Sequence, residues 1–331
     1  MALQGSGTIS LQDLADEFDN TAPYSLDEFY RGGAEVPEAT ENANVPTSGA
    51  ISLGDFYGAT KRIRVDYTVS SNTDAGIDLK AIADANGYSA GITDVYVTVN
   101  SGVYVGSPSS GESYAIVADN FASGDIIHIT NNGYIVGAGG VGGIGGSAIG
   151  SQARDSSAQS YQHGTAGGRG IYTTVATNIT NNGTIAGGGG GGGSGGCCQA
   201  RYGDFTGCGA SGGGGGAGYQ PALGGAGSNG ANVGLPDGNY LAPDGGDATI
   251  TTGGSGGVAR TASGSQVGGV SGASGAGGNW GQAGANGSSS TVTYYDWWAQ
   301  DGGTGGAAGH YLVGNSNVTW VATGTRLGQV A

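Results

Sequence analysis

Lysine and glutamate do not occur in residues 133–331, whose only charged side chains are seven aspartates and five arginines. Residues 1–132 differ, because they hold 18 of the 25 acidic residues and five of the ten Lys and Arg residues. Phosphate binding needs clustered Lys and Arg, and the arginines of the second half are scattered. The charge pattern therefore argues against a nucleic-acid partner.

Long hydrophobic runs are also missing, since no stretch approaches the ~20 apolar residues of a membrane-spanning helix. The first residues lack the charged-then-apolar pattern of a cleaved signal. We therefore expect no membrane insertion and, if the protein acts outside a cell, export without a leader of its own. Only seven prolines are present and no Gly-X-Y register occurs, which excludes collagen.

Cysteine is scarce, with Cys197 and Cys198 adjacent and Cys208 ten residues further on. Three interpretations are open. The thiols lie in a surface loop and are inert or adventitiously oxidised, a disulfide joins Cys197 or Cys198 to Cys208, or a zinc site forms. The zinc site lacks a fourth ligand at finger-like spacing.

A short phrase recurs near the N-terminus, in "ISLQDLADEF" (9–18), "YSLDEFYRGG" (24–33) and "ISLGDFYGAT" (51–60). Each contains the S-x-x-D/E pattern that opens a helix, and each helix must be short because Pro or Gly follows. Three such helices are too small to make a core together. We therefore expect residues 1–62 to dock on another protein and to bury against it the apolar side chains Leu11, Phe29 and Phe56.

Residues 63–132 have the alternation of β-strands. "IRVDYTV" (63–69) and "DVYVTVNSGVYVG" (94–106) alternate apolar and polar residues, and turn signals separate further short strands. "DLKAIADANG" (78–87) is the one helical pattern. The sequence predicts a small β-sandwich or β-prism here.

The remaining chain, residues 133–331, contains most of the 76 glycines. "ITNNGYIVGAGG" (129–140) and "ITNNGTIAGGGG" (179–190) repeat one unit, and in "GGVGGIGG" (139–146) every third residue is not glycine. A period of three is that of polyproline II geometry. Ordering glycine costs about 1–2 kcal/mol per residue, which interstrand hydrogen bonds offset only in a bundle.

A flexible linker is the alternative, but linkers are rich in Glu, Lys and Pro. This half has no Glu or Lys, three prolines and all four tryptophans. The expected fold class is mainly β and irregular. It comprises short N-terminal helices (1–62), a small β domain (63–132) and a sandwich of polyglycine II helices with short flanking strands (133–331).

Catalytic motifs are lacking. His128, His163 and His310 are not embedded in a nucleophile or metal motif, and "DGGD" (244–247) is typical of a turn. We expect no enzyme activity, no cofactor and no metal. Loops joining the glycine rods carry exposed aromatics among polar residues, as binding surfaces do. The receptor-binding candidates are Tyr161, His163, Tyr202, Phe205, Tyr240, Tyr294, Tyr295, Trp297 and Trp298.

With these features the sequence resembles bacteriophage tail-fibre adhesins, in particular those of T-even phages. Their distal domain packs polyglycine II helices and binds the host through the connecting loops. "SGAISLGDFYG" (48–58) and the end of the chain (309–331) are also similar to segments of many phage tail proteins. The N-terminal phrases depart from the T-even attachment domain. The similar glycine runs are 137–146, 187–196, 209–218 and 268–278.

The resemblance implies a virion tail protein that is assembled in the host cytoplasm and acts at the host cell surface. Residues 1–62 would attach to another tail or baseplate protein. The loops would bind a surface polysaccharide or an outer-membrane protein. The alternatives are a purely structural tail component and a capsule depolymerase. Against the depolymerase, the glycine array lacks paired Asp or Glu at glycosidase spacing.

Overall fold

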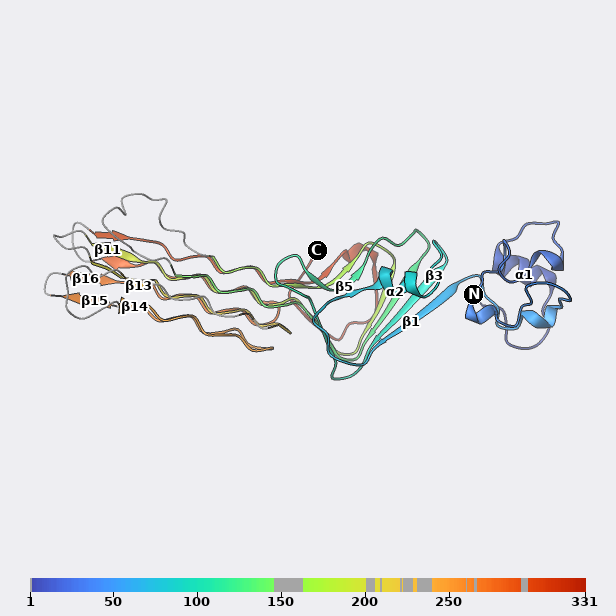
Figure 1. Ribbon diagram of the computed structural model, residues 1–331, viewed down its shortest axis with the longest axis horizontal. Helices are drawn as coiled ribbons and strands as arrows, with labels where there is room; N and C mark the ends of the chain where they lie inside the picture. Colours follow the sequence, from blue (N-terminus) through green and yellow to red (C-terminus); the bar gives the residue numbers. More distant parts are fainter. Residues whose placement is uncertain are drawn as a thin grey trace.

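The computed structural model is elongated, with three parts in a row (Figure 1). Residues 2–60 form a compact unit at one end, parallel sheets form the middle, and glycine-rich segments run to the far end. The C-terminus lies in the middle part, so the glycine-rich segments are insertions between strands rather than a tail. The described residues are 2–145, 163–200, 206–208, 210–220, 222, 229–230, 240–259, 261–264, 267–292 and 297–331.

The N-terminal unit contains four short helical elements. At each repeated phrase the acidic residue accepts a hydrogen bond from the backbone N–H of the serine three positions earlier. The distances are 2.7 Å for Asp13, 3.3 Å for Glu28 and 2.7 Å for Asp55. The predicted helix starts are confirmed, although only the first phrase forms an α-helix. The elements are α1 (Leu11–Phe18), η1 (Leu26–Glu28), η2 (Thr40–Asn42) and η3 (Leu53–Phe56).

Contrary to expectation, the three phrases do form a core together. Phe29 and Phe56 are fully buried beside Phe18, with ring centroids 6.0–6.5 Å apart in tilted and edge-to-face arrangements. Leu11 packs partly buried against the same cluster. Each phrase contributes one phenylalanine to a common centre, and an aromatic ring buries about 150–250 Å². The side chains expected to be buried against another protein are thus buried within this unit.

Phe29→Leu is expected to destabilise the N-terminal unit by about 1–2 kcal/mol, because a smaller side chain leaves a cavity among three rings. Limited proteolysis within residues 2–60 would measure the change. The exposed neighbour Asp27, replaced by Asn, serves as the control. Equal protease resistance of both variants would contradict the aromatic core.

Three parallel sheets enclose the core of the middle part. The first contains β1 (Ile63–Val69), β3 (Thr93–Val99), β6 (Ile126–Asn131), β9 (Thr177–Asn181) and β20 (Val318–Ala322). The second contains β4 (Tyr104–Gly106), β7 (Tyr134–Val136), β10 (Thr184–Ala186) and β21 (Thr325–Leu327). The third contains β2 (Ile77–Asp78), β5 (Tyr114–Ala118), β8 (Arg169–Thr173), β19 (His310–Val313) and β22 (Gln329–Val330).

The chain passes from the third sheet to the first and then to the second in each turn, as in a parallel β-helix. Isoleucine and valine stack in register inside it, as at Val97, Ile129 and Ile179. The predicted helix is present as α2 (Leu79–Ala85), which buries Leu79 and Ala83 against this core. A short η5 (Asn315–Asn317) precedes β20.

These sheets cross the boundary expected at residue 132, because strands between 169 and 186 and after 310 belong to them. The two "ITNNG" units lie directly over one another. Asn131 and Asn181 are paired in register and buried, and the Nδ2 of Asn131 donates to the Oδ1 of Asn181 at 2.8 Å. The 50-residue repeat is therefore one turn of the β-helix with a long excursion inserted.

His128 lies half-buried on the outer face of the first sheet, stacked on Tyr96 with ring centroids 4.3 Å apart. Burial lowers the pKa of His128 below its usual 6.5. Arg62 and Arg64 act in the same direction, and Asp94 opposes them. Below pH 6.5 the unfolded chain consequently binds this proton more readily than the folded protein does.

Stability is therefore expected to fall as the pH is lowered from 7 toward 5.5, where most carboxylates stay ionised. His128→Gln should reduce this loss, as measured by urea unfolding of both proteins at each pH. Identical pH dependence in the two proteins would show that His128 does not contribute.

Candidate functional site at the end of the glycine array

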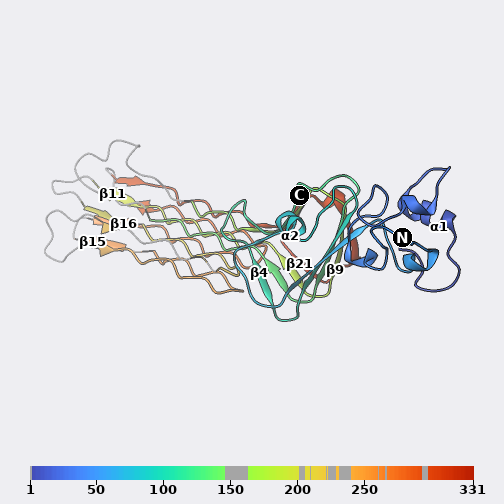
Figure 2. The ribbon, with the colours of Figure 1, turned by 45° about the vertical axis from the view of Figure 1, so that its right-hand side comes forward.

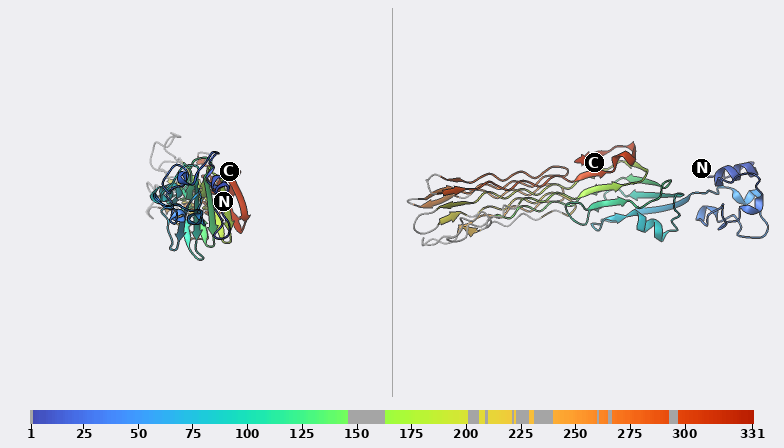
Figure 3. Two further views of the ribbon diagram at one scale, coloured as in Figure 1. Left: turned by 90° about the vertical axis from the view of Figure 1, so that its right-hand side faces the viewer. Right: turned by 90° about the horizontal axis from the view of Figure 1, so that it is seen from above.

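The glycine segments are joined to one another by backbone hydrogen bonds. The central run, 187–196, donates N–H groups to 164–168, 211–217 and 282–288. The carbonyls of residues 188–196 accept from three other segments, 140–143, 272–278 and 303–309. The central run is therefore enclosed by six neighbours, which run side by side when the molecule is seen from above (Figure 3).

The partners of the central run repeat every three residues. Gly188 and Gly191 donate to Gly168 and Thr165, at 2.8 and 2.9 Å. The next residue of each triplet donates to 211–217 and the third to 282–288. Three donor directions around one backbone are what a three-residue turn provides.

Close backbone contact explains the glycines. A Cβ on Gly190, Gly191 or Gly192 would lie 2.0 Å from a carbonyl oxygen of a neighbouring segment. Ordinary van der Waals contact begins near 3.4 Å. No residue other than glycine therefore fits the centre of this array, which is packed rather than solvated over the described segments.

Sequence reasoning missed two of the six neighbours, 164–168 and 282–288, because neither is a glycine run. Both have glycine at every third position, as at Gly164 and Gly167 and at Gly284 and Gly287. A Cβ at any of these four would lie 1.9–2.1 Å from a carbonyl oxygen of residues 188–194. The spacing G-x-x-G, rather than glycine density, was the signal that would have found them.

Short antiparallel strands occupy the end of the array farthest from the N-terminal unit (Figure 2). They form three small sheets, β12–β11–β18, β13–β14 and β15–β16–β17. Their bounds are β11 (Cys198–Ala200), β12 (Thr206–Cys208), β13 (Asn229–Gly230), β14 (Tyr240–Leu241), β15 (Thr261–Gly264), β16 (Val267–Val270), β17 (Thr291–Val292) and β18 (Trp297–Ala299).

Three of the receptor-binding candidates lie on strands at this distal end, as the strand pairing of the backbone shows. Tyr240 begins β14, and Trp297 and Trp298 lie on β18 opposite Ala200 and Gln199 of β11. Segments more than 90 residues apart in the chain thus meet there. The candidates that lie outside the described residues are Tyr161, Tyr202, Phe205, Tyr294 and Tyr295.

His163 and Cys197 lie in the array itself rather than in a joining loop. The exposed His163 accepts a hydrogen bond at Nδ1 from the backbone N–H of Thr304, at 3.0 Å. Cys197 is buried, donates from its thiol to the Oε1 of Gln300, and has its pKa raised to about 11 by burial. The interpretation of Cys197 as a surface-loop thiol is therefore wrong.

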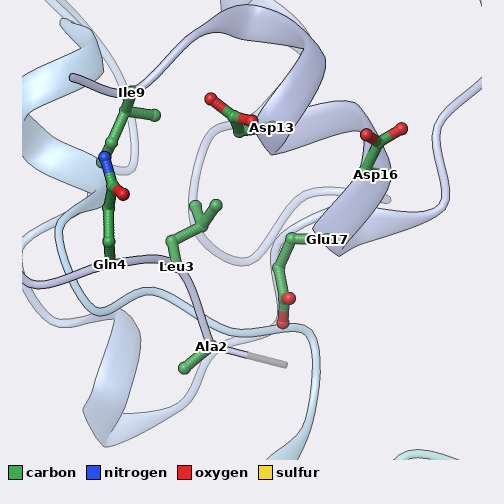
Figure 4. Close-up of a pocket in the computed structure, with 7 residues that line it drawn as sticks. All are labelled: Ala2, Leu3, Gln4, Ile9, Asp13, Asp16 and Glu17. Carbon is green, nitrogen blue, oxygen red and sulfur yellow. The ribbon is translucent and has the colours of Figure 1, made fainter.

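A shallow pocket opens at the opposite end of the molecule, in the N-terminal unit (Figure 4). Three carboxylates and three apolar side chains line it, and each carboxylate accepts a hydrogen bond within the unit. Asp13 accepts from Ser10, Asp16 from Gln12 and Glu17 from Thr60. Bonds from Ser10 lower the pKa of Asp13. The lining residues are Ala2, Leu3, Gln4, Ile9, Asp13, Asp16 and Glu17.

Metal-binding clusters and membrane-spanning helices are both absent among the described residues. No group of three His, Cys, Asp or Glu side chains there is arranged to hold a metal ion. Neither α-helix of the described chain has the length and apolarity needed to cross a membrane.

The described chain is thus a long frame with a compact unit at one end and small antiparallel sheets at the other. Residues 64–331 match the family described as phage tail fibre adhesin Gp38, so the chain belongs to that family. The resemblance drawn from the sequence is confirmed, and the family is one of adhesins rather than enzymes. The chain is thus a component of a bacteriophage tail fibre.

One solved structure is also similar, described as the gp37–gp38 adhesin tip complex of the bacteriophage S16 long tail fiber. The identity is 21%, both chains are covered over 100% of their length, and the TM-score is 0.46. No curated protein matches the chain. The family match begins at residue 64, so the N-terminal unit lies outside it.

Proposed function

We propose that this adhesin binds a host surface polysaccharide or outer-membrane protein through the segments that join its glycine rods. The enclosure of residues 187–196 by six hydrogen-bonded neighbours carries the proposal. The three-residue repeat of these bonds supports identifying the rods as polyglycine II helices. Such an array fixes the ends of the rods in position, and a rigid frame with varied loops is how recognition domains are built.

The N-terminal unit is proposed to attach the adhesin to another tail protein. It lies at the end opposite the small antiparallel sheets (Figure 1) and contains ten acidic residues and one arginine in residues 1–60. A partner with a basic surface would suit this charge. Because Phe29 and Phe56 are buried, we expect the contact to use exposed acidic residues such as Asp13 and Asp16 instead.

Adsorption to host cells tests the receptor-binding role. Replacing both Trp297 and Trp298 by Ala is expected to weaken adsorption by about 30-fold or more, as loss of an aromatic hot spot does. Trp280→Ala is the matched control, because that side chain lies at the other end of the rods, near Tyr134 of β7. Equal adsorption of both variants would favour a purely structural protein. Sugar release from purified capsule would instead indicate a depolymerase.

Deletion of residues 1–60 separates the two roles. The shortened protein is expected to bind cells but to be missing from virions when it replaces the full chain during phage growth. Western blotting of purified particles measures the incorporation. Normal incorporation would remove the attachment role from the N-terminal unit without affecting the receptor-binding role.

A further inference from the structure

Cys198 and Cys208 face each other across two neighbouring strands at the distal end. β11 and β12 pair antiparallel, and Cys198 is the register partner of Cys208. Directly opposed residues of an antiparallel pair have Cα atoms about 4.5 or 5.5 Å apart. Both values lie within the 4.4–6.8 Å that a disulfide spans. The backbone therefore brings these two positions to bonding separation.

The adjacent Cys197 is engaged elsewhere. Its thiol is buried and donates to Gln300, while its carbonyl accepts from the Oγ of Ser290 at 2.8 Å. Ser290 is the residue before β17 and Gln300 is the residue after β18, so both partners lie where a neighbouring rod meets its strand. Cys197 also precedes β11, so it has no register partner in β12. Of the two vicinal cysteines, only Cys198 is placed opposite Cys208.

We propose that Cys198 and Cys208 form a disulfide after the virion leaves the reducing host cytoplasm. Two thiols lose two protons and two electrons, a sulfur–sulfur bond forms, and dioxygen accepts both electrons and protons to give hydrogen peroxide. Cytoplasmic thiols are normally kept reduced, whereas extracellular proteins retain disulfides. The bond closes the base of the connection that holds Tyr202 and Phe205. The disulfide itself is independent of the proposed function. Only its value for presenting Tyr202 and Phe205 to a receptor rests on that function.

Peptide mapping of the full-length protein tests the bond, because Arg201 lies between the two cysteines. Trypsin cuts after Arg169, Arg201 and Arg260, so peptides 170–201 and 202–260 stay joined only through a disulfide. In air-exposed protein alkylated before digestion, mass spectrometry is expected to find the linked pair. A phosphine reductant should abolish it.

Variants then assign the sulfur atoms. Cys197→Ser is expected to keep the linked pair, and Cys198→Ser and Cys208→Ser are expected to lose it. Fragment ions that separate Cys197 from Cys198 give the same assignment in the wild-type protein if a variant fails to fold. Alkylation of all three cysteines, a bond that survives Cys198→Ser, or a disulfide-linked dimer on a non-reducing gel would each overturn the proposal. None of these readouts requires receptor binding.

Discussion

Gly191→Ala is expected to disrupt the whole glycine array. The new Cβ would lie 2.0 Å from the carbonyl oxygen of Val141, so the two rods would have to separate by about 1 Å or more. Gly191 donates to Thr165 at 2.9 Å and accepts from Gly306 at 2.7 Å, so relieving one contact breaks bonds on other sides. Each buried backbone group left without a partner costs about 1–3 kcal/mol, so the total loss is about 4 kcal/mol or more.

Hydrogen exchange and urea unfolding would measure this effect. Amides of residues 187–196, 272–278 and 303–309 should lose protection together, because each rod is bonded to several others. Gly5→Ala is the control, since a Cβ there meets nothing within 4 Å. Val141→Ala is a second control, because that side chain is 43% exposed on the neighbouring rod. An unchanged urea midpoint for Gly191→Ala would show that the rods are not packed as described.

The same contacts explain how much of the array the sequence predicts. Positions 187–193 are all glycine because neighbours surround them, and this density is visible without a structure. Neighbouring rods need glycine only where they face another backbone, which leaves residues such as Ala285 and Thr304 free to vary. Composition therefore predicts the enclosed centre of an array better than its outer rods.

In the middle part, the sequence predicts individual strands but not how far along the chain the sheets continue. Alternation in 94–99 correctly indicates a strand with one buried face. Nothing local shows that Ile129 and Ile179 stack, because glycine rods separate them in sequence. The repeat "ITNNG" carried that information, since identical turns at a fixed interval mark successive coils of a β-helix. The core of the β-helix is complete only when the strands that follow each glycine-rich segment have joined the sheets.

In the N-terminal unit, the sequence predicts where the helices start but not how they pack. The S-x-x-D/E pattern fixes where each helical turn starts, because capping is a local interaction. Burial of Phe18, Phe29 and Phe56 against one another is not local, and short helices alone give no sign of it. The charged side chains that remain exposed in this unit are acidic, as at Asp13, Asp16 and Asp27.

Asn181→Ala is expected to destabilise the β-helix by about 2–4 kcal/mol, because the buried amide of Asn131 loses one acceptor and three partly buried backbone groups each lose a hydrogen bond. The Nδ2 of Asn181 donates to the carbonyls of Thr323 and Thr325, at 2.8 and 3.1 Å. Its Oδ1 accepts from Asn131 at 2.8 Å and from the N–H of Gly183 at 3.3 Å. This one side chain therefore joins three successive turns, including the last.

The adjacent Asn182 provides a matched control. It is exposed and bonded to Asn132 at 2.9 Å, so Asn182→Ala removes the same chemical group from the outside of the same corner. Water replaces that bond, and the change should stay within about 0.5 kcal/mol. Urea midpoints and hydrogen exchange over residues 318–330 compare the two variants. Because β19 and β20 follow directly from the last rod, loosening the final turn should also release one end of the array. Equal midpoints would mean that stacked side chains inside the sheets, rather than the asparagine pair, hold the final turn in place.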